Sequence, residues 1–187
     1  YLTPAVGKMA KYLKLPVVLI MSYGNFIANP QWNKDKFRPV PVKGKLVCIA
    51  TADEVNELSA DEINRRIKEN FVYDDFRYQY DNKIKIDFKE RARGLHRILY
   101  QCCECGTEHE MYSGGSTLEC KHCGRKWEMT EYGRLEAHDG ETRFAHIPDW
   151  FKWERENVRR EVESGSYCFE DEIEVHTLPK NKFFAQG

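Results

Sequence analysis

The stretch that decides the fold is CCECGTEHEMYSGGSTLECKHCG, residues 102–124 of a 187-residue chain. It contains two C-x-x-C-G turns, one from Cys102 to Gly106 and the other from Cys120 to Gly124. Five of the seven cysteines fall in this stretch, whereas a disulfide framework usually shows an even and dispersed set. The pattern therefore predicts a single metal ion held by Cys102, Cys105, Cys120 and Cys123.

The spacing suits a zinc ribbon whose metal is structural. Two thiolates separated by two residues in a tight turn can coordinate the same ion, and the glycine that follows can take a positive φ. Residues 106–119 separate the two pairs and include Gly114 and Gly115, which favour a hairpin. Zn²⁺ with four thiolates is tetrahedral and closed to water and substrate. Iron in the same cage and a redox-active dithiol remain as alternatives.

Neighbouring residues complete the predicted metal centre. Four thiolates around Zn²⁺ carry a local charge of about −2, which nearby basic side chains can offset (Lys121, Arg125 and Lys126). Cys103 could replace Cys102 as the first ligand, but only Cys102 has the C-x-x-C-G spacing. Cys48 and Cys168 are expected in the core, because free cysteine is often buried. His109 and His122 are expected outside the ligand shell, which four thiolates already fill.

Composition indicates a folded chain without a strong charge preference. Hydrophobic residues make up 41%, aromatic residues 13% and charged residues 32%, with a formal net charge of −1. The aromatic content argues against disorder, and the balanced charge argues against a dedicated nucleic-acid binder. No apolar run reaches the ~18 residues of a membrane span, and no signal peptide is recognisable. These features predict a soluble, cytoplasmic protein.

The residues before the cysteines predict an α/β fold. Thr3 and Pro4 suit a helix start, and Val6, Met9, Ala10 and Leu13 follow at helical spacing. Residues 16–23 form an uninterrupted apolar run, typical of a strand buried on both faces in a parallel sheet. A second strand is expected over residues 42–50. Ser59 and Glu62 have capping-box spacing before a helix with Ile63 and Ile67 on one face.

Further elements are expected on both sides of the cysteine stretch. Residues 73–80 suit a short helix. A longer helix is expected from Ile147 to about Gly165, with Trp150, Trp153, Val158 and Val162 on a packed face. Residues 172–175 alternate like a strand and lead into a predicted β-hairpin. Because both chain ends fall beside incomplete elements, we expect a fragment of a larger protein.

Other polar and aromatic groups give no clear active site. Asp74 and Asp75 with Arg77 could form an acid–base group, but a solvated helix end is the simpler interpretation. Tyrosines could stack on bases, although such spacing is more typical of a core (Tyr12, Tyr73, Tyr78 and Tyr80). Tryptophans with basic neighbours could lie at a membrane surface, although packing is favoured (Trp150, Trp153, Lys152 and Arg155). No phosphate-binding loop or nucleophile elbow is present in the sequence.

Taken together, these stretches resemble one enzyme family. Residues 2–20, with Leu15-Pro16-Val17-Val18, resemble the segment after the third motif of bacterial lysophospholipid acyltransferases (1-acylglycerol-3-phosphate acyltransferases) and their Val-Pro-Val-Val-type strand. Five later stretches resemble a subgroup with a zinc ribbon after the acyltransferase core: residues 74–77, 94–100, 118–120, 130–133 and 146–150. The resemblance covers nearly the whole chain, and its ribbon combined with His146-Ile-Pro-Asp-Trp150 is its most specific part.

The resemblance implies a three-part organisation. Residues 1–93 would be the C-terminal part of a glycerolipid acyltransferase-type α/β domain. Residues 94–136 would be the four-cysteine zinc ribbon, and residues 137–187 a helix and the start of a β-rich segment. Pro16 and its neighbours would shape the core.

The resemblance also implies an activity in phospholipid biosynthesis. A fatty acyl group would pass from acyl-CoA or acyl carrier protein to a lysophospholipid such as lysophosphatidic acid, with peripheral membrane contact of the full-length enzyme. The family's catalytic H-x-x-x-x-D motif is absent, since no histidine here has an aspartate five residues later. Catalytic residues are thus expected upstream of Tyr1, and the 187-residue chain is expected to be inactive alone. The alternative is a zinc-ribbon module that binds nucleic acid or a protein partner.

Overall fold

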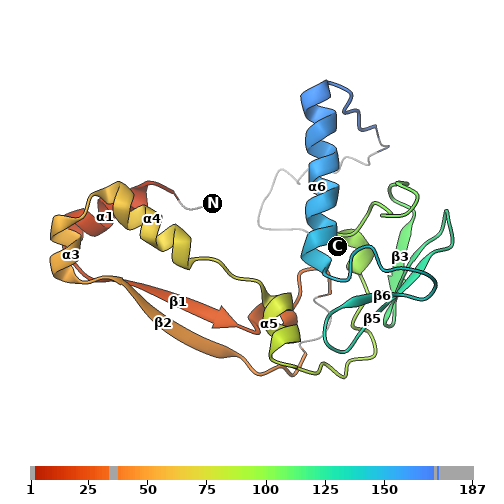
Figure 1. Cartoon of the computed structure of the whole chain (residues 1–187), viewed down its shortest axis with the longest axis horizontal. Coiled ribbons are helices and arrows are strands. Elements are labelled where there is room, and N and C mark those ends of the chain that lie inside the picture. The colour runs from red at the N-terminus through yellow and green to blue at the C-terminus, as the bar shows by residue number, and fades with distance from the viewer. Residues whose placement is uncertain (1–2, 34–37, 171, 173–187) are drawn as a thin grey trace, which may run out of the picture. The chain divides into compact units, whose positions relative to one another are not determined.

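The computed structural model of this chain describes residues 3–33, 38–170 and 172. The chain divides into two compact units, Tyr1–Glu154 and Arg155–Gly187, and each is described by itself. Within the described residues the first unit contains a two-stranded sheet and a four-stranded sheet, so the fold is mixed α/β. Figure 1 shows the elements in chain order.

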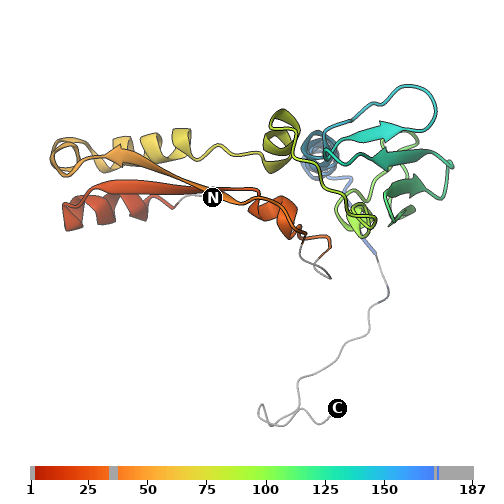
Figure 2. The ribbon, with the colours of Figure 1, turned by 90° about the horizontal axis from the view of Figure 1, so that it is seen from below.

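The first group of elements is a β-hairpin with helices on one face. Helix α1 (Ala5–Leu13) leads into β1 (Val17–Tyr23), which pairs with β2 (Lys43–Ala50). Two helices follow, α3 (Ala52–Glu57) and α4 (Ala60–Asn70). Figure 2 shows β1 and β2 side by side along most of their length. The helices and the inner face of the hairpin enclose one apolar core (Ala10, Ile49, Ala50, Val55, Ile63 and Ile67).

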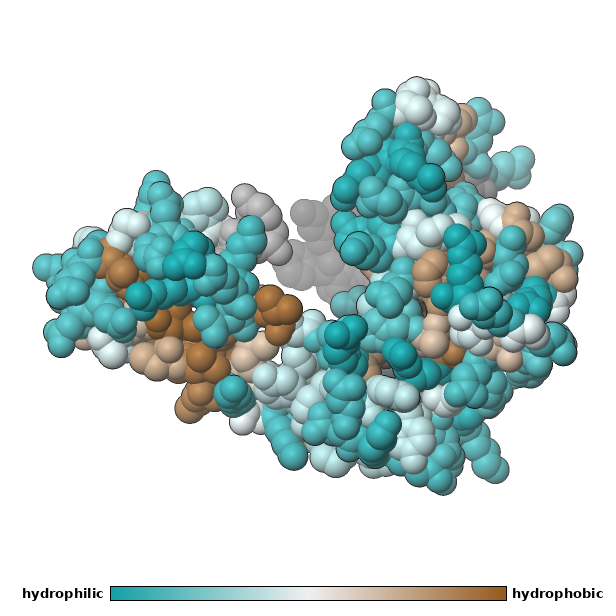
Figure 3. All heavy atoms as spheres, in the orientation of Figure 1, coloured by the Kyte–Doolittle hydropathy of each residue, from teal (hydrophilic) through white to brown (hydrophobic). Residues whose placement is uncertain are grey.

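The prediction of a parallel strand buried on both faces is wrong for the described chain. β1 pairs antiparallel with β2, with Ile20 opposite Leu46 and Val18 opposite Cys48. Successive side chains on a strand point to opposite faces, so only one side of the hairpin meets the helices. On the other side Ile20 is 71% exposed and Leu46 70% exposed. Hydrophobic residues gather over this part of the surface in Figure 3.

Two cysteines expected in the core are in fact exposed. Cys48 belongs to the outer face of the hairpin, because its partner in the register is Val18. Cys168 follows the last described helix and is exposed as well. Both predictions rested on the general tendency of free cysteine to be buried, which local position overrides here.

Helix boundaries agree with the predictions to within one or two residues. Pro4 occupies the N-cap position of α1 instead of the first helical position. The Ser59 hydroxyl accepts the amide of Glu62 at 3.1 Å, as predicted, but the Glu62 carboxylate pairs with Arg65. The predicted capping box is thus half formed. The complete box lies one helix earlier, where Thr51 and Glu54 cap α3 reciprocally.

Two short helices pack together, one from the connection between β1 and β2 and the other from the segment between α4 and the cysteine region. Helix α2 (Asn25–Ala28) lies beside α5 (Asp75–Asp81), which confirms the helix predicted around residues 73–80. The Asp75 carboxylate joins them by accepting the amides of Gly24 and Phe26, both at 2.8 Å. Tyr73 and Tyr78 pack on the Tyr23 ring with centroids 5.0 Å and 4.9 Å apart.

The cysteine region forms an antiparallel sheet of short strands. The single-turn helix η1 (Leu95–Arg97) precedes strands in the order β3 (Met111–Gly114), β4 (Thr117–Cys120), β5 (Lys126–Met129) and β6 (Leu135–Ala137). Their inward side chains join the largest core, with Leu118, Trp127 and Leu135 fully buried. The predicted hairpin between the cysteine pairs is β3–β4, which turns at Gly115.

Helix α6 (Ile147–Ser164) confirms the long helix predicted after the ribbon. Its first two turns belong to the first unit, where Trp150 is fully buried and meets Trp127 at a centroid distance of 4.9 Å. This burial supports the packing interpretation of Trp150. In the second unit Val162 is 58% exposed, and Gly165 ends the helix with φ 71°. Apart from Glu172, the predicted strand at 172–175 and its hairpin lie outside the described residues. Among the helices that the structure describes, none has the length and apolarity to cross a bilayer.

Candidate metal centre

The four predicted ligands converge on one point. Cys102 and Cys105 come from the turn after Gln101, and Cys120 and Cys123 come from the turn between β4 and β5. All four sulfur atoms lie within 4.8 Å of one another. The Sγ atoms of Cys102 and Cys123 are 3.7 Å apart, and those of Cys105 and Cys120 are 3.8 Å apart. A tetrahedron with Zn–S bonds of about 2.3 Å has edges of about 3.8 Å, so the cluster fits a metal such as zinc.

The two turns have the same backbone geometry. Gly106 donates its amide to the Cys102 carbonyl at 2.9 Å, and Gly124 donates to the Cys120 carbonyl at the same distance. Both glycines have a positive φ, 76° and 75°, as the sequence predicted. The symmetry explains why each C-x-x-C-G stretch presents two sulfurs to the same side.

The sulfur atoms differ in exposure. Cys102 and Cys120 are buried, whereas Cys105 and Cys123 are exposed. Burial raises the pKa of the Cys102 and Cys120 thiols, so these two need a cation nearby to ionise at neutral pH. Burial also acts on Cys105, but hydrogen bonds with Thr107 and then His122 outweigh it and lower its pKa to about 6. Cys105 therefore ionises more readily than Cys102 and Cys120.

The remaining candidates lie outside the sulfur cluster, as predicted. Cys103 is buried, and burial raises its pKa to about 12, which keeps it a neutral core residue. His109 stacks on Tyr100 with ring centroids 5.5 Å apart. His122 is exposed, and its hydrogen bond to Cys105 helps to lower the pKa of that thiol. Within the described residues, the group that could hold a metal contains only the four cysteines.

The basic residues around the centre are paired with carboxylates. Lys121 and Lys126 both approach Glu119, the latter at 3.4 Å. Arg125 lies 4.0 Å from Glu104. The predicted offset of the thiolate charge by Lys121, Arg125 and Lys126 is thus weakened, because these cations also neutralise neighbouring acids.

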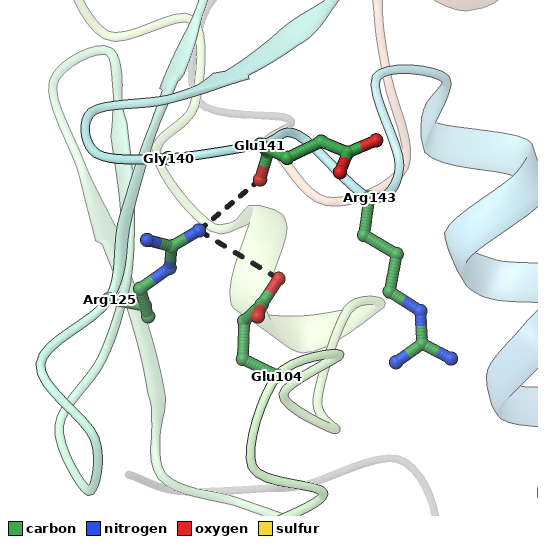
Figure 4. Close-up of a pocket in the computed structure, with 5 residues that line it drawn as sticks. All are labelled: Glu104, Arg125, Gly140, Glu141 and Arg143. Carbon is green, nitrogen blue, oxygen red and sulfur yellow. Dashed lines mark hydrogen bonds and ion pairs between the residues drawn. The ribbon is translucent and has the colours of Figure 1, made fainter.

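A hollow of about 610 Å³ lies beside the first cysteine turn (Glu104, Arg125, Gly140, Glu141 and Arg143). Figure 4 shows Arg125 between the Glu104 carboxylate and the Glu141 carbonyl, which it meets at 3.2 Å. Arg143 donates to the Cys103 carbonyl and lies over the Trp153 ring, 5.0 Å from its centroid. Two arginines and two glutamates leave the hollow with no net charge, so it does not select an anion. Its polar groups hold the 140–143 loop against the cysteine turn.

A buried carboxyl group fixes the backbone next to the first ligand. Glu154 on α6 is fully buried and accepts the amide of Gln101 at 2.9 Å. Trp150, one turn earlier, donates its indole N–H to the Gln101 carbonyl at 3.0 Å. Burial raises the pKa of Glu154 to about 8. The sequence missed this contact because a glutamate on a charged helix resembles a solvated residue. Its i, i+4 spacing from Trp150 was the available signal.

The Asp74–Asp75 pair serves helix ends, as the simpler interpretation held, but Asp75 is buried and is not the solvated residue that was predicted. Asp74 caps α5 by accepting the amide of Arg77 at 3.0 Å. Its second oxygen lies 2.7 Å from Nε2 of His146, a contact that the sequence did not predict. A hollow of about 340 Å³ adjoins this pair and is lined mainly by apolar atoms (Phe26, Tyr73, Asp74, Asp75, Phe76 and Pro148).

The centre is thus a closed set of four sulfurs supported by a buried core, and it offers a metal no open position for substrate. Comparison with protein-family models, with curated proteins and with solved structures finds no match to this chain.

Proposed function

We propose that the ribbon binds one Zn²⁺ whose role is structural. The observation that carries this proposal is the convergence of four cysteine sulfurs within 4.8 Å. Four thiolates complete the tetrahedral shell, so the metal would stabilise the two turns and would take no part in a reaction. Native mass spectrometry of the purified chain should find one zinc per molecule. A bound iron atom, or no metal, would contradict the proposal.

The proposed wider role is that of a non-catalytic part of a cytoplasmic acyltransferase. The full enzyme would transfer a fatty acyl group from acyl-CoA or acyl carrier protein to a lysophospholipid. The support is the sequence resemblance, from Leu15-Pro16-Val17-Val18 through the ribbon to His146-Ile-Pro-Asp-Trp150. A closed metal site is consistent with a supporting role, because the acceptor hydroxyl would need a general base that this site lacks.

Three observations test the acyltransferase proposal. The gene that encodes this chain should also encode an H-x-x-x-x-D motif upstream of Tyr1, and the full-length product should acylate lysophosphatidic acid. The 187-residue chain, loaded with zinc, should show no acyl transfer above buffer. A gene without that motif, or activity of the isolated chain, would refute this assignment while leaving the structural zinc site intact.

A second candidate is a ribbon that binds nucleic acid. One observation favours it: Tyr112 is 52% exposed, stacks on His96 and lies beneath the Lys121 ammonium at 4.8 Å. Exposed aromatic rings with a cation can stack on bases. Fluorescence anisotropy with a labelled single-stranded oligonucleotide at low salt tests it, and binding lost in Tyr112→Ala would support it.

A further inference from the structure

The hollow of about 340 Å³ lies where α2, α5 and the first turn of α6 come together, within the first unit. We call it the aromatic hollow, because the rings of Phe26, Tyr73 and Phe76 line it. Phe26 and Phe76 meet edge to face, with ring centroids 5.6 Å apart. Tyr73 meets Tyr23 in the same way at 5.0 Å. The volume falls at the lower end of the roughly 300–1,000 Å³ that small-molecule sites occupy.

The aromatic hollow carries negative charge. Asp74 and Asp75 are among its lining residues, and none of the described residues that line it is basic. Within the described part of the chain, one ion pair reaches these carboxylates, from His146 to Asp74 at 2.7 Å. Two carboxylates and one imidazole sum to −2 when His146 is neutral and to −1 when it is protonated. The hollow therefore attracts a cation in either state.

The hydrogen bonds of the two carboxylates decide which kind of cation fits. Asp75 accepts two backbone amides, one on each oxygen, both at 2.8 Å. Asp74 accepts the amide of Arg77 with one oxygen and lies 2.7 Å from His146 with the other. All four oxygens already have a partner, whereas a primary ammonium has three N–H groups to satisfy. A quaternary ammonium has none, and it needs only negative potential and apolar contact.

We propose that the aromatic hollow binds a small quaternary ammonium ion. Its methyl groups would contact the rings of Phe26, Tyr73 and Phe76, since aromatic rings attract such cations. Asp74 would balance the charge, because 33% of its side chain is exposed whereas Asp75 is 4% exposed. A neutral apolar molecule would gain nothing from the carboxylates, and an anion would be repelled by them. This site uses no ligand of the metal centre and does not depend on acyl transfer.

An NMR titration tests the proposal with the zinc-loaded 187-residue chain and tetramethylammonium chloride as the probe. Amide signals of the residues that line the aromatic hollow should shift saturably, with a dissociation constant on the order of 1 mM, as suits so small a ligand. Ammonium chloride at the same ionic strength should bind at least roughly tenfold more weakly, because its N–H groups would lack acceptors.

Two further probes distinguish a free cation from a phosphate-bearing headgroup. Choline should bind at least as tightly as tetramethylammonium. Phosphocholine should bind at least roughly tenfold more weakly than choline, because the carboxylates repel its phosphate.

Two substitutions at Tyr73 isolate the contribution of its ring. The Tyr73 hydroxyl accepts the Gly24 amide at 3.1 Å, and both Tyr73→Phe and Tyr73→Leu remove this hydrogen bond. Tyr73→Phe keeps the ring and should still bind the probe. Tyr73→Leu keeps only apolar bulk and should bind roughly fivefold more weakly than Tyr73→Phe.

A second pair of variants isolates the charge. Asp74→Asn keeps an oxygen that can cap α5 but removes one negative charge, so it should weaken binding roughly fivefold. Asp81→Asn removes the same charge from an exposed position at the other end of this helix and should change binding less than about twofold. Thermal unfolding should show that all four variants fold.

Four results would overturn the proposal. The first is that tetramethylammonium causes no saturable shift in the wild-type chain. The second is equal affinity in folded Tyr73→Leu and Tyr73→Phe, which would show that the ring does not contact the cation. The third is an equal loss in Asp74→Asn and Asp81→Asn, which would indicate attraction by net charge alone. The fourth is tighter binding of phosphocholine than of choline, which would assign the hollow to a phosphate-bearing headgroup.

Discussion

Cysteine is the residue type whose position in the sequence was most informative. The spacing identified Cys102, Cys105, Cys120 and Cys123, because a tetrahedral site needs two tight turns and each turn has a fixed local pattern. The same residue type was misplaced at Cys48, whose exposure depends on which face of β1 and β2 meets the helices. The positions of the metal ligands follow from a local sequence pattern. The burial of a residue on a sheet depends instead on elements that are distant in the sequence.

Replacing a buried ligand should abolish stable metal binding. In Cys102→Ser the alcohol stays protonated and the remaining sulfurs cannot close the tetrahedron. We expect an affinity loss larger than the roughly 10- to 100-fold that follows loss of an outer-shell partner. Competition against a chromogenic zinc chelator measures it. Cys48→Ser is the control, and equal affinity in both variants would exclude Cys102 as a ligand.

The buried Glu154 carboxyl predicts a pH-dependent stability. Its pKa is raised to about 8 in the folded chain from the ordinary value of 4.5, so the folded state holds the proton more tightly. The resulting stability is complete below about pH 4.5 and is lost as the pH rises through about 8. Its full size is on the order of 5 kcal/mol.

Glu154→Gln tests this carboxyl group. The amide oxygen can still accept the Gln101 N–H but does not ionise. Urea unfolding at a series of pH values should show that the wild-type chain loses stability between about pH 5 and 8 relative to the variant. Glu156→Gln, at an exposed position on the same helix, should leave the wild-type slope unchanged. If the free energy of unfolding followed the same pH dependence in the wild type and in Glu154→Gln, the pKa of Glu154 would be the same in the folded and the unfolded chain.

At the scale of elements, the sequence predicted most helices and strands but not all of their partners. The runs at residues 17–23 and 43–50 form strands as expected, because their β-branched composition is a local property. Whether a strand pairs with a parallel or an antiparallel neighbour is not decided locally. The apolar run at residues 17–23 therefore led to the wrong prediction of a parallel neighbour. The contact of Asp74 with His146 was missed for the same reason, since 72 positions separate the two residues.

The packing of α1 on α4 depends on Gly7. A Cβ atom there would lie 2.1 Å from the Ala60 carbonyl oxygen, and the Gly7 amide already donates to Asn64 at 2.8 Å. Gly7→Ala should therefore push the helices apart and destabilise the chain by about 1–3 kcal/mol, despite the higher helix propensity of alanine. Thermal unfolding measures the loss. Gly44→Ala on β2 is the matched control, because a Cβ there meets nothing within 4 Å.

A small effect at Gly7 would be informative as well. If Gly7→Ala were as stable as Gly44→Ala, the α1–α4 contact would be loose enough to absorb a methyl group. The closely packed core between the helices and the hairpin would then be an incorrect description of this region.

At the scale of the whole first unit, the described chain has separate apolar cores. One lies under α1, α3 and α4, and another fills the ribbon around Leu118, Trp127 and Leu135. The ribbon strands have only three or four residues each, which is short for a sheet that must fold on its own. Sheets of such short strands are commonly stabilised by a bound metal, because metal binding is coupled to folding.

Metal removal should consequently destabilise the ribbon core far more than the core under α1, α3 and α4. Hydrogen exchange followed by mass spectrometry, with and without a strong chelator, should show amides of β3–β6 losing at least roughly 100-fold protection, because metal binding and folding are coupled. Amides of α4 should change little, since their core has no sulfur ligand. Equal loss in α4 would mean that the two cores fold as one cooperative unit. Unchanged protection in β3–β6 would mean that the sulfur cluster contributes little to the fold, and the structural role of the metal would have to be abandoned.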